Sequence, residues 1–233
     1  MNNLVALIAT FALALAWLRT NDFAAHHGRV SRLVSRKIIH IGTGPIFVLC
    51  WLLFNNDPAA RFMAALVPLG ITTQFLLVGT GIMKDPAAVK AMSRTGDRRE
   101  ILRGPLFYGI AFVILTILFW RDSAIGIVAL MIMCGGDGLA DMMGKRFGTS
   151  NLPWSSRKTW AGSIAMFAGG WVLAVAVIAI YIVFQGMPGP LAQFLPKVTL
   201  IALVATAIES LPAEDIDNIT VPAVSVLLGL LIF

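Results

Sequence analysis

The sequence predicts an all-α polytopic integral membrane protein with about eight transmembrane helices, in a range of roughly seven to nine. Three observations predict this class. Of the 233 residues, 58% are hydrophobic and only 13% are charged, with a mean hydropathy of +0.84. Apolar runs long enough to cross roughly 30 Å of hydrocarbon recur along the whole chain. Lys and Arg concentrate in every second loop between these runs, which is typical of membrane proteins.

The apolar runs are separated by short segments rich in Asn, Pro and Gly, which favour turns. We find no internal repeat and expect one membrane domain over residues 1–233. The first run lacks a basic leader and a small-residue cleavage site, so we expect a retained first helix. The predicted spans are 3–18, 38–54, 62–80, 104–120, 123–136, 160–184, 197–212 and 219–233.

The net charge of +6 has a simple cause in topology. Three segments, 19–37, 84–103 and 144–160, carry nearly all of the Lys and Arg. The positive-inside rule places these segments in the cytoplasm and the N-terminus outside. The charge therefore gives no reason to expect a nucleic-acid partner. The remaining cations are Arg61, Arg121 and Lys197.

The two cysteines, Cys50 and Cys134, both lie inside apolar runs. Their spacing gives neither a disulfide framework nor a metal site. We interpret them as packing residues.

The stretch GGDGLADMMGKRFG, 135–148, interrupts an apolar run with two acids. Asp137 and Asp141 are four residues apart, so they share one face if the helix continues past the glycines. A charged side chain at the centre of a span costs about 2.5–3.5 kcal/mol, so acids in spans usually serve function. Paired carboxylates suit Mg²⁺, and we predict that these two hold it. The alternative is that Asp137 caps a helix and Asp141 pairs with Lys145.

Cations and hydroxyls follow the two acids directly. Such groups bind phosphate oxygens, so together with a metal they predict a site for a nucleoside triphosphate. The glycines also permit close backbone approach to a phosphate. An ordinary positive-inside loop would explain the cations alone. The predicted nucleotide-binding residues here are Lys145, Arg146, Ser156, Lys158, Thr159 and Gly162.

A second cluster lies at the start of the second run. Arg36, Lys37 and His40 fall on one helix face. His is rare and costly in a span, so we weigh a catalytic His40 with phosphate-binding Arg36 and Lys37 evenly against a structural role. The arginines of 92–109 are better explained by anionic lipid head groups than by a phosphate clamp.

The last cluster is ESLPAEDIDNITVP, 209–222. This cluster places two acids and an amide at the same membrane depth as Asp137, on the predicted cytoplasmic side. They are Glu209, Asp217 and Asn218. We predict that Glu209 and Asp217 act in catalysis and that Asn218 helps bind nucleotide. A solvated acidic turn is the simpler explanation for Glu214 and Asp215.

Five segments together resemble the membrane-bound polyprenol kinases, which include phytol kinase, farnesol kinase and, more distantly, dolichol kinase. The resemblance implies phosphoryl transfer from a nucleoside triphosphate, typically CTP or UTP, to an isoprenoid alcohol such as phytol, farnesol or geranylgeraniol. The matching segments are RKIIHIGTG (36–44), SRTGDRREILRGPLFYG (93–109), GGDGLADMMGKRFG (135–148), LPWSSRKTWAGSIAMFAGG (152–170) and ESLPAEDIDNITVP (209–222).

Two other functions remain open. The chain is also similar to phosphatidate cytidylyltransferases, but SSRKTWAG has Trp160 and Ala161 where that family carries an acid. A transporter with an acidic site is the alternative of another class, although its acids should lie nearer the middle of the membrane. We expect a bacterial cytoplasmic membrane, with the site facing the cytoplasm, and leave the oligomeric state open.

Overall fold

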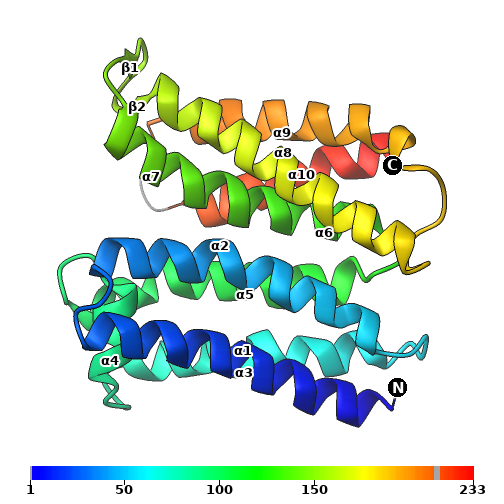
Figure 1. The fold of residues 1–233 in the computed structure, drawn as a ribbon, viewed down its shortest axis with the longest axis horizontal. Helices are drawn as coiled ribbons and strands as arrows, with labels where there is room; N and C mark the ends of the chain where they lie inside the picture. The colour runs from blue at the N-terminus through cyan, green and yellow to red at the C-terminus, as the bar shows by residue number, and fades with distance from the viewer. Residues whose placement is uncertain (1, 213–215) are drawn as a thin grey trace. The chain divides into compact units, whose positions relative to one another are not determined.

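The structure is a computed structural model that describes residues 2–212 and 216–233. It consists of two compact units, unit 1 (Met1–Ile117) and unit 2 (Leu118–Phe233), and it is 77% helical with almost no sheet (Figure 1). This confirms the predicted all-α membrane class. The single domain over 1–233 stays a prediction.

Seven helical segments within the described residues are long and apolar enough to span a membrane. An eighth apolar helix, Asp217–Ile232, is shorter. Ile8, Ile164 and Leu231 are 61%, 66% and 79% exposed, as lipid-facing side chains should be. The seven segments are Asn3–His26, Leu33–Leu53, Ala60–Thr80, Arg98–Leu118, Ala124–Phe147, Trp160–Val183 and Leu191–Glu209.

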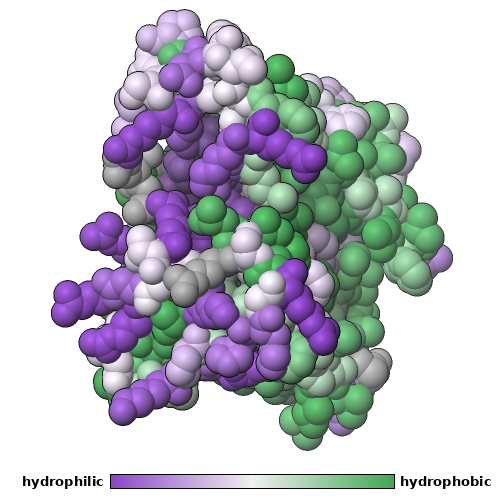
Figure 2. Space-filling model, turned by 60° about the vertical axis from the view of Figure 1, so that its left-hand side comes forward, coloured by the Kyte–Doolittle hydropathy of each residue, from purple (hydrophilic) through white to green (hydrophobic). Residues whose placement is uncertain are grey.

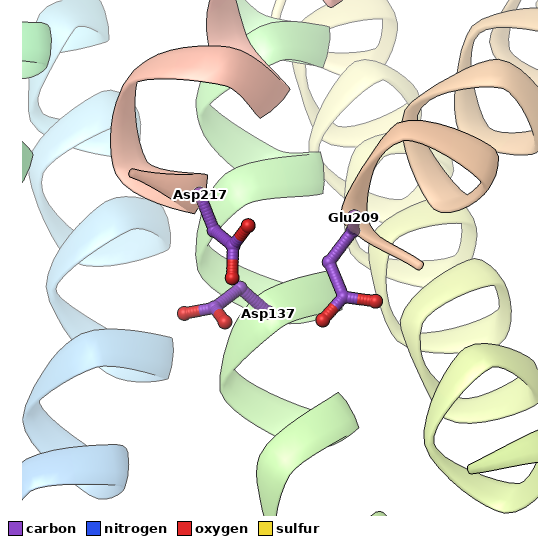
Figure 3. Close-up of side chains that lie close together, drawn as sticks. All are labelled: Asp137, Glu209 and Asp217. Carbon is purple, nitrogen blue, oxygen red and sulfur yellow. The ribbon is translucent and has the colours of Figure 1, made fainter. Parts of the chain in front are cut away.

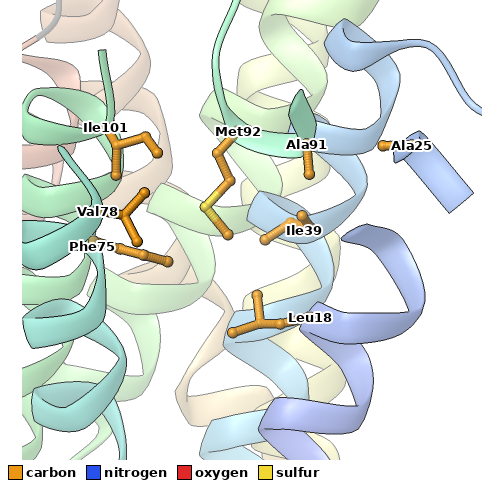
Figure 4. Packing of buried hydrophobic residues seen from close by; sticks show 8 residues of the cluster. All are labelled: Leu18, Ala25, Ile39, Phe75, Val78, Ala91, Met92 and Ile101. Atoms are coloured by element: carbon orange, nitrogen blue, oxygen red, sulfur yellow. The ribbon is translucent and has the colours of Figure 1, made fainter. Parts of the chain in front are cut away.

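Unit 1 is a helical bundle. A cluster of buried side chains from its helices, including Leu18, Ile39, Phe75 and Ile101, forms a hydrophobic core near the cation-rich loops (Figure 4). Its elements are α1 (Asn3–His26), α2 (Arg32–Cys50), η1 (Trp51–Leu53), α3 (Ala60–Thr80), α4 (Pro86–Met92), η2 (Arg98–Leu102) and α5 (Gly104–Leu118).

Unit 2 contains one long helical segment made of α6, a π-helical turn η3 and α7, packed against α8. A short antiparallel hairpin, β1–β2, connects α7 to α8 (Figure 1). The elements are α6 (Ala124–Met131), η3 (Ile132–Asp137), α7 (Gly138–Phe147), β1 (Asn151–Leu152), β2 (Ser155–Thr159), α8 (Trp160–Val183), η4 (Leu191–Gln193), α9 (Leu195–Glu209) and α10 (Asp217–Ile232).

The first helix is longer than its apolar run, which was predicted to end at residue 18. It continues to His26, because polar side chains in its last turns find partners. Arg19 bonds to Asp85 at 2.8 Å and lies 3.4 Å from Asp22. Hydropathy marks where a helix leaves the apolar layer, whereas backbone hydrogen bonds decide where it ends.

The glycines of GGDG serve helix packing. A Cβ on Gly135 would lie 2.6 Å from the Gly169 carbonyl oxygen, and a Cβ on Gly169 would lie 2.6 Å from that of Gly135. A Cβ on Gly136 would lie 2.6 Å from the Met166 sulfur. Both glycines of the pair at 135–136 thus let η3 approach α8 closely. Phosphate approach at these two glycines stays a prediction.

Figure 2 shows hydrophilic side chains gathered on one part of the visible surface and hydrophobic side chains covering another part. Cys50 and Cys134 are both free thiols and both buried. Their prediction as packing residues is confirmed.

Candidate functional site

Three carboxylates meet at the polar end of unit 2. Asp137 closes the π-helical turn, Glu209 is the last residue of α9, and Asp217 is the first of α10 (Figure 3). Each offers one oxygen, and these oxygens all lie within 4.8 Å of one another. Carboxylate oxygens at this separation suit a hard divalent cation such as Mg²⁺. We call this group the carboxylate cluster.

Lys158 neutralises part of the carboxylate cluster. Its ammonium donates to Glu209 and lies 3.1 Å from an oxygen of Asp217. The Glu209 residue is only 3% exposed, so its charge needs a partner. Burial alone would lower the pKa of Lys158, but the charges of Glu209 and Asp217 outweigh it and raise that pKa. The ammonium therefore stays charged beside the acids.

The hairpin β1–β2 positions Lys158. The buried Ser155 hydroxyl accepts from the Lys158 backbone N–H at 3.2 Å. Thr159 follows directly and caps α8 by accepting from the Gly162 N–H at 3.1 Å. Trp154 ties the hairpin to the end of α9, because its indole N–H lies 3.2 Å from both the carbonyl and the hydroxyl of Ser210. Lys158 is thus held next to Glu209 from both sides.

Asp141 lies outside the carboxylate cluster. Its side chain pairs with Lys145 at 2.8 Å, one helical turn further along α7. Asp137 makes no side-chain cap, since the helix continues through it, and the alternative of a capping role is wrong for this residue. The metal pair Asp137 and Asp141 stays a prediction, while the structure brings Asp137 together with Glu209 and Asp217.

The other predicted nucleotide-binding residues of unit 2 are spread over α7, β2, α8 and α10. Lys145, Arg146 and Ser156 are exposed, and Asn218 follows Asp217 and is half-buried. Gly162 is buried between α7 and α8, where a Cβ would lie 3.1 Å from the Ala140 carbonyl oxygen. Its N–H already donates to Thr159. Their binding of nucleotide stays a prediction, as does that of Lys158 and Thr159.

The second predicted cluster lies on α2 in unit 1. The His40 ring packs against Tyr108 with centroids 4.4 Å apart, and the Tyr108 hydroxyl donates to the His40 carbonyl at 2.6 Å. Lys37 is buried and Arg36 is half-buried. Packing on Tyr108 gives His40 a structural role, and its catalytic role stays a prediction. Glu214 and Asp215, interpreted as a solvated turn, lie outside the described residues.

Sequence reasoning did not single out Trp154, Ser210 or Tyr108 as site residues. Trp154 sits inside a matching segment, LPWSSRKTWAGS, beside the hydroxyls and cations of the predicted nucleotide loop. The indole N–H of a tryptophan in such a loop usually finds a hydrogen-bond partner, and this could have indicated a role for Trp154. Its partner at the end of α9 is visible only in the structure.

The fold and the site define a polytopic membrane protein with an acid–base cluster at the polar end of its helices. Its relatives are enzymes. A probable chloroplastic phytol kinase of Triticum aestivum is 40% identical over 230 residues, covering 98% of this chain and 77% of that protein. Chloroplastic phytol kinase 1 of Arabidopsis thaliana is 36% identical over 235 residues, covering 100% of this chain and 77% of that protein. A chloroplastic farnesol kinase of Arabidopsis thaliana is 39% identical over 203 residues, covering 85% of this chain and 65% of that protein.

The chain belongs to the phytol and farnesol kinase family, and it is a phosphotransferase that acts on an alcohol. No protein-family model matches the chain, and no solved structure matches it significantly. The relatives named above are chloroplastic plant proteins. They lend no support to the bacterial inner membrane expected from the sequence.

Proposed function

We propose that the protein transfers the γ-phosphoryl group of CTP or UTP to the terminal hydroxyl of an isoprenoid alcohol such as phytol, farnesol or geranylgeraniol. The alcohol oxygen forms a bond to the γ-phosphorus, the bond from that phosphorus to the β,γ-bridging oxygen breaks, and the hydroxyl proton passes to water. The products are the isoprenyl phosphate and the nucleoside diphosphate. The names of the relatives support the acceptor class.

The observation that carries the proposal for the site is the carboxylate cluster with Lys158 beside it. Asp137, Glu209 and Asp217 present oxygens within 4.8 Å of one another, which is the donor set that Mg²⁺ accepts. Bound there, Mg²⁺ would neutralise phosphate charge that develops during transfer. Phosphoryl transfer needs positioning and charge neutralisation more than covalent help from the protein.

The remaining residues of unit 2 would position the triphosphate. Lys158 holds a positive charge at the edge of the cluster, and Lys145 and Arg146 supply further charge on the exposed face of α7. Such cations bind phosphate oxygens through charge-assisted hydrogen bonds. We propose that this face is cytoplasmic, because it carries the cation-rich segment 144–160. A water-soluble triphosphate and a membrane-dissolved alcohol can meet only at such an interface.

The test uses purified protein in lipid nanodiscs with Mg²⁺. Each of CTP, UTP, ATP and GTP, labelled at the γ-phosphate, is offered with phytol, farnesol or geranylgeraniol. We expect organic-extractable label and equimolar nucleoside diphosphate, both dependent on alcohol and both reduced by about a hundredfold or more in Asp137→Asn. Release of pyrophosphate from CTP with phosphatidate, and no labelled isoprenyl phosphate, would instead support a cytidylyltransferase.

A further inference from the structure

Unit 1 contains a cavity of about 670 Å³ that the function proposed above does not use. It lies where α3 ends, α4 begins and η2 begins, and the end of α1 also lines it. Its volume falls within the range of about 300–1,000 Å³ that is typical of small-ligand sites. All of its lining residues belong to unit 1 and lie at the cation-rich end.

Three cations line the cavity: Lys84, Lys90 and Arg98. Lys90 donates to the His26 carbonyl at 2.6 Å, at the end of α1. Within residues 2–212 and 216–233, the side chains of Lys84 and Arg98 make no hydrogen bond or ion pair. Two unpaired cations facing one cavity indicate an anionic ligand, because phosphate and carboxylate groups are their usual partners.

Two acids also line the cavity, but both have other partners. The Asp85 carboxylate bonds to Arg19 at 2.8 Å and caps α4 by accepting from the Ala88 N–H at 3.0 Å. The Asp97 carboxylate accepts from the Arg99 backbone N–H at 2.9 Å. Neither neutralises Lys84 or Arg98, so the cavity keeps a positive excess.

The position of Arg98 depends on a glycine. Gly81 ends α3 with φ at +86°, and its Cβ, if present, would overlap the Arg98 guanidinium. The left-handed backbone therefore favours glycine for conformation, and the missing side chain leaves room for the guanidinium. Arg98 is thus packed against the backbone at the cavity.

Apolar side chains also line the cavity. Val78 belongs to the buried hydrophobic core of unit 1 (Figure 4). Met83 and Val89 pack against that core. These three side chains also line the cavity. A ligand that satisfies both the cations and the apolar side chains carries an anionic group joined to an apolar body.

We propose that this cavity binds the phosphate head group of an anionic membrane phospholipid. Lys84 and Arg98 contact the phosphate, and Val78, Met83 and Val89 contact the glycerol and the first methylenes of the acyl chains. Cationic pockets between transmembrane helices at the cytoplasmic side are places where anionic head groups bind. A specific site differs from general attraction to the surface in that it depends on particular cations.

The test measures the thermal stability of the full protein, purified in detergent, without nucleotide or alcohol. The probes are dioctanoyl phosphatidylglycerol, dioctanoyl phosphatidylcholine and inorganic phosphate. We expect the melting temperature to rise with phosphatidylglycerol concentration until the site is saturated, because a ligand of the folded state stabilises it by mass action. The other two probes should leave the melting temperature unchanged. An equal rise with phosphatidylcholine, or a full rise with inorganic phosphate, would overturn the proposal.

Matched variants distinguish binding in the cavity from general attraction of the lipid to surface charge. Arg98→Gln and Lys84→Gln should each raise the half-saturating phosphatidylglycerol concentration about fivefold, because one cation near an anionic lipid contributes about 1 kcal/mol. The control is Arg99→Gln, which removes the same charge from the neighbouring residue, whose side chain does not line the cavity. Arg99→Gln should leave the half-saturating concentration unchanged. An equal effect of all three variants would show that only surface charge matters. Lys84 is exposed, so its variant keeps the test open if Arg98→Gln fails to fold.

Discussion

Lys158 on β2 and Glu209 at the end of α9 form an ion pair that joins the hairpin of unit 2 to a helix far away in the sequence. The side chain of Glu209 is 4% exposed and that of Lys158 is 23% exposed. Because Asp137 and Asp217 lie in the same cluster, this pair sets the charge balance of the proposed metal site.

Replacing Lys158 should destabilise the protein. Lys158→Met leaves the buried Glu209 carboxylate without its cation, and breaking a buried pair costs about 3–5 kcal/mol. We expect the lower end of this range because the ammonium is partly exposed. The double variant Lys158→Met with Glu209→Gln should recover part of the lost melting temperature, as a double-mutant cycle would report. No recovery would mean that the two side chains are not coupled.

Asp137 and Asp141 should differ in their dependence on Mg²⁺. Asp137→Asn removes a member of the carboxylate cluster, so we expect turnover to fall by about a hundredfold or more, with a higher Mg²⁺ concentration for half-maximal rate. Asp141→Asn removes the charge that pairs with Lys145, outside the carboxylate cluster, and should shift this concentration much less. Equal shifts in the two variants would favour the metal pair predicted from the sequence.

Asp85 should stabilise unit 1 in two separable ways. Asp85→Ala loses the cap of α4 and the pair with Arg19, whereas Asp85→Asn keeps a capping side chain and loses the charge. We expect melting temperatures in the order wild type, Asn, Ala, with the cap contributing about 0.5–2 kcal/mol. The reverse order of Asn and Ala would contradict the capping role.

The charge of Asp85 should also make the stability of the protein depend on pH. Burial alone would raise the pKa of this carboxyl, but the Ala88 N–H and Arg19 outweigh it and lower the pKa. A lowered pKa contributes stability above the unfolded-state value, which is lost as the pH falls through the folded-state value. The stability gap between wild type and Asp85→Asn should therefore be constant near neutral pH and close below about pH 4. Thermal melts across this range measure it.

Close packing of η3 on α8 predicts a graded pair of variants. Gly169→Ala places a Cβ 2.6 Å from the Gly135 carbonyl oxygen, whereas Gly170→Ala meets Ile132 Cα at 3.2 Å. Ala favours a helix over Gly by about 1 kcal/mol in both cases. We expect Gly169→Ala to lower the melting temperature and to reduce activity, because η3 carries Asp137, and Gly170→Ala to be close to neutral. Two neutral variants would contradict this packing.

The sequence by itself determined the class of this protein and the course of its spans. Apolar runs of membrane length and the absence of polar alternation permit little other than transmembrane helices, because the backbone must satisfy its own hydrogen bonds in lipid. The segments around Asp137, Lys158 and Glu209 also identified the polyprenol kinase family, to which the chain belongs. Helix ends were less predictable, as α1 shows, since side-chain partners such as Asp85 for Arg19 extend helices past their apolar run.

Only the tertiary structure decided which polar residues meet. Spacing along a helix tells which side chains share a face. On that basis the sequence predicts that Asp137 and Asp141 hold Mg²⁺ together. The structure instead brings Asp137 to Glu209 and Asp217, because α9 ends and α10 begins at its level. The structure also shows that Gly135 and Gly136 pack closely against α8. Such meetings depend on how helices distant in sequence pack, which the local pattern of residues does not encode.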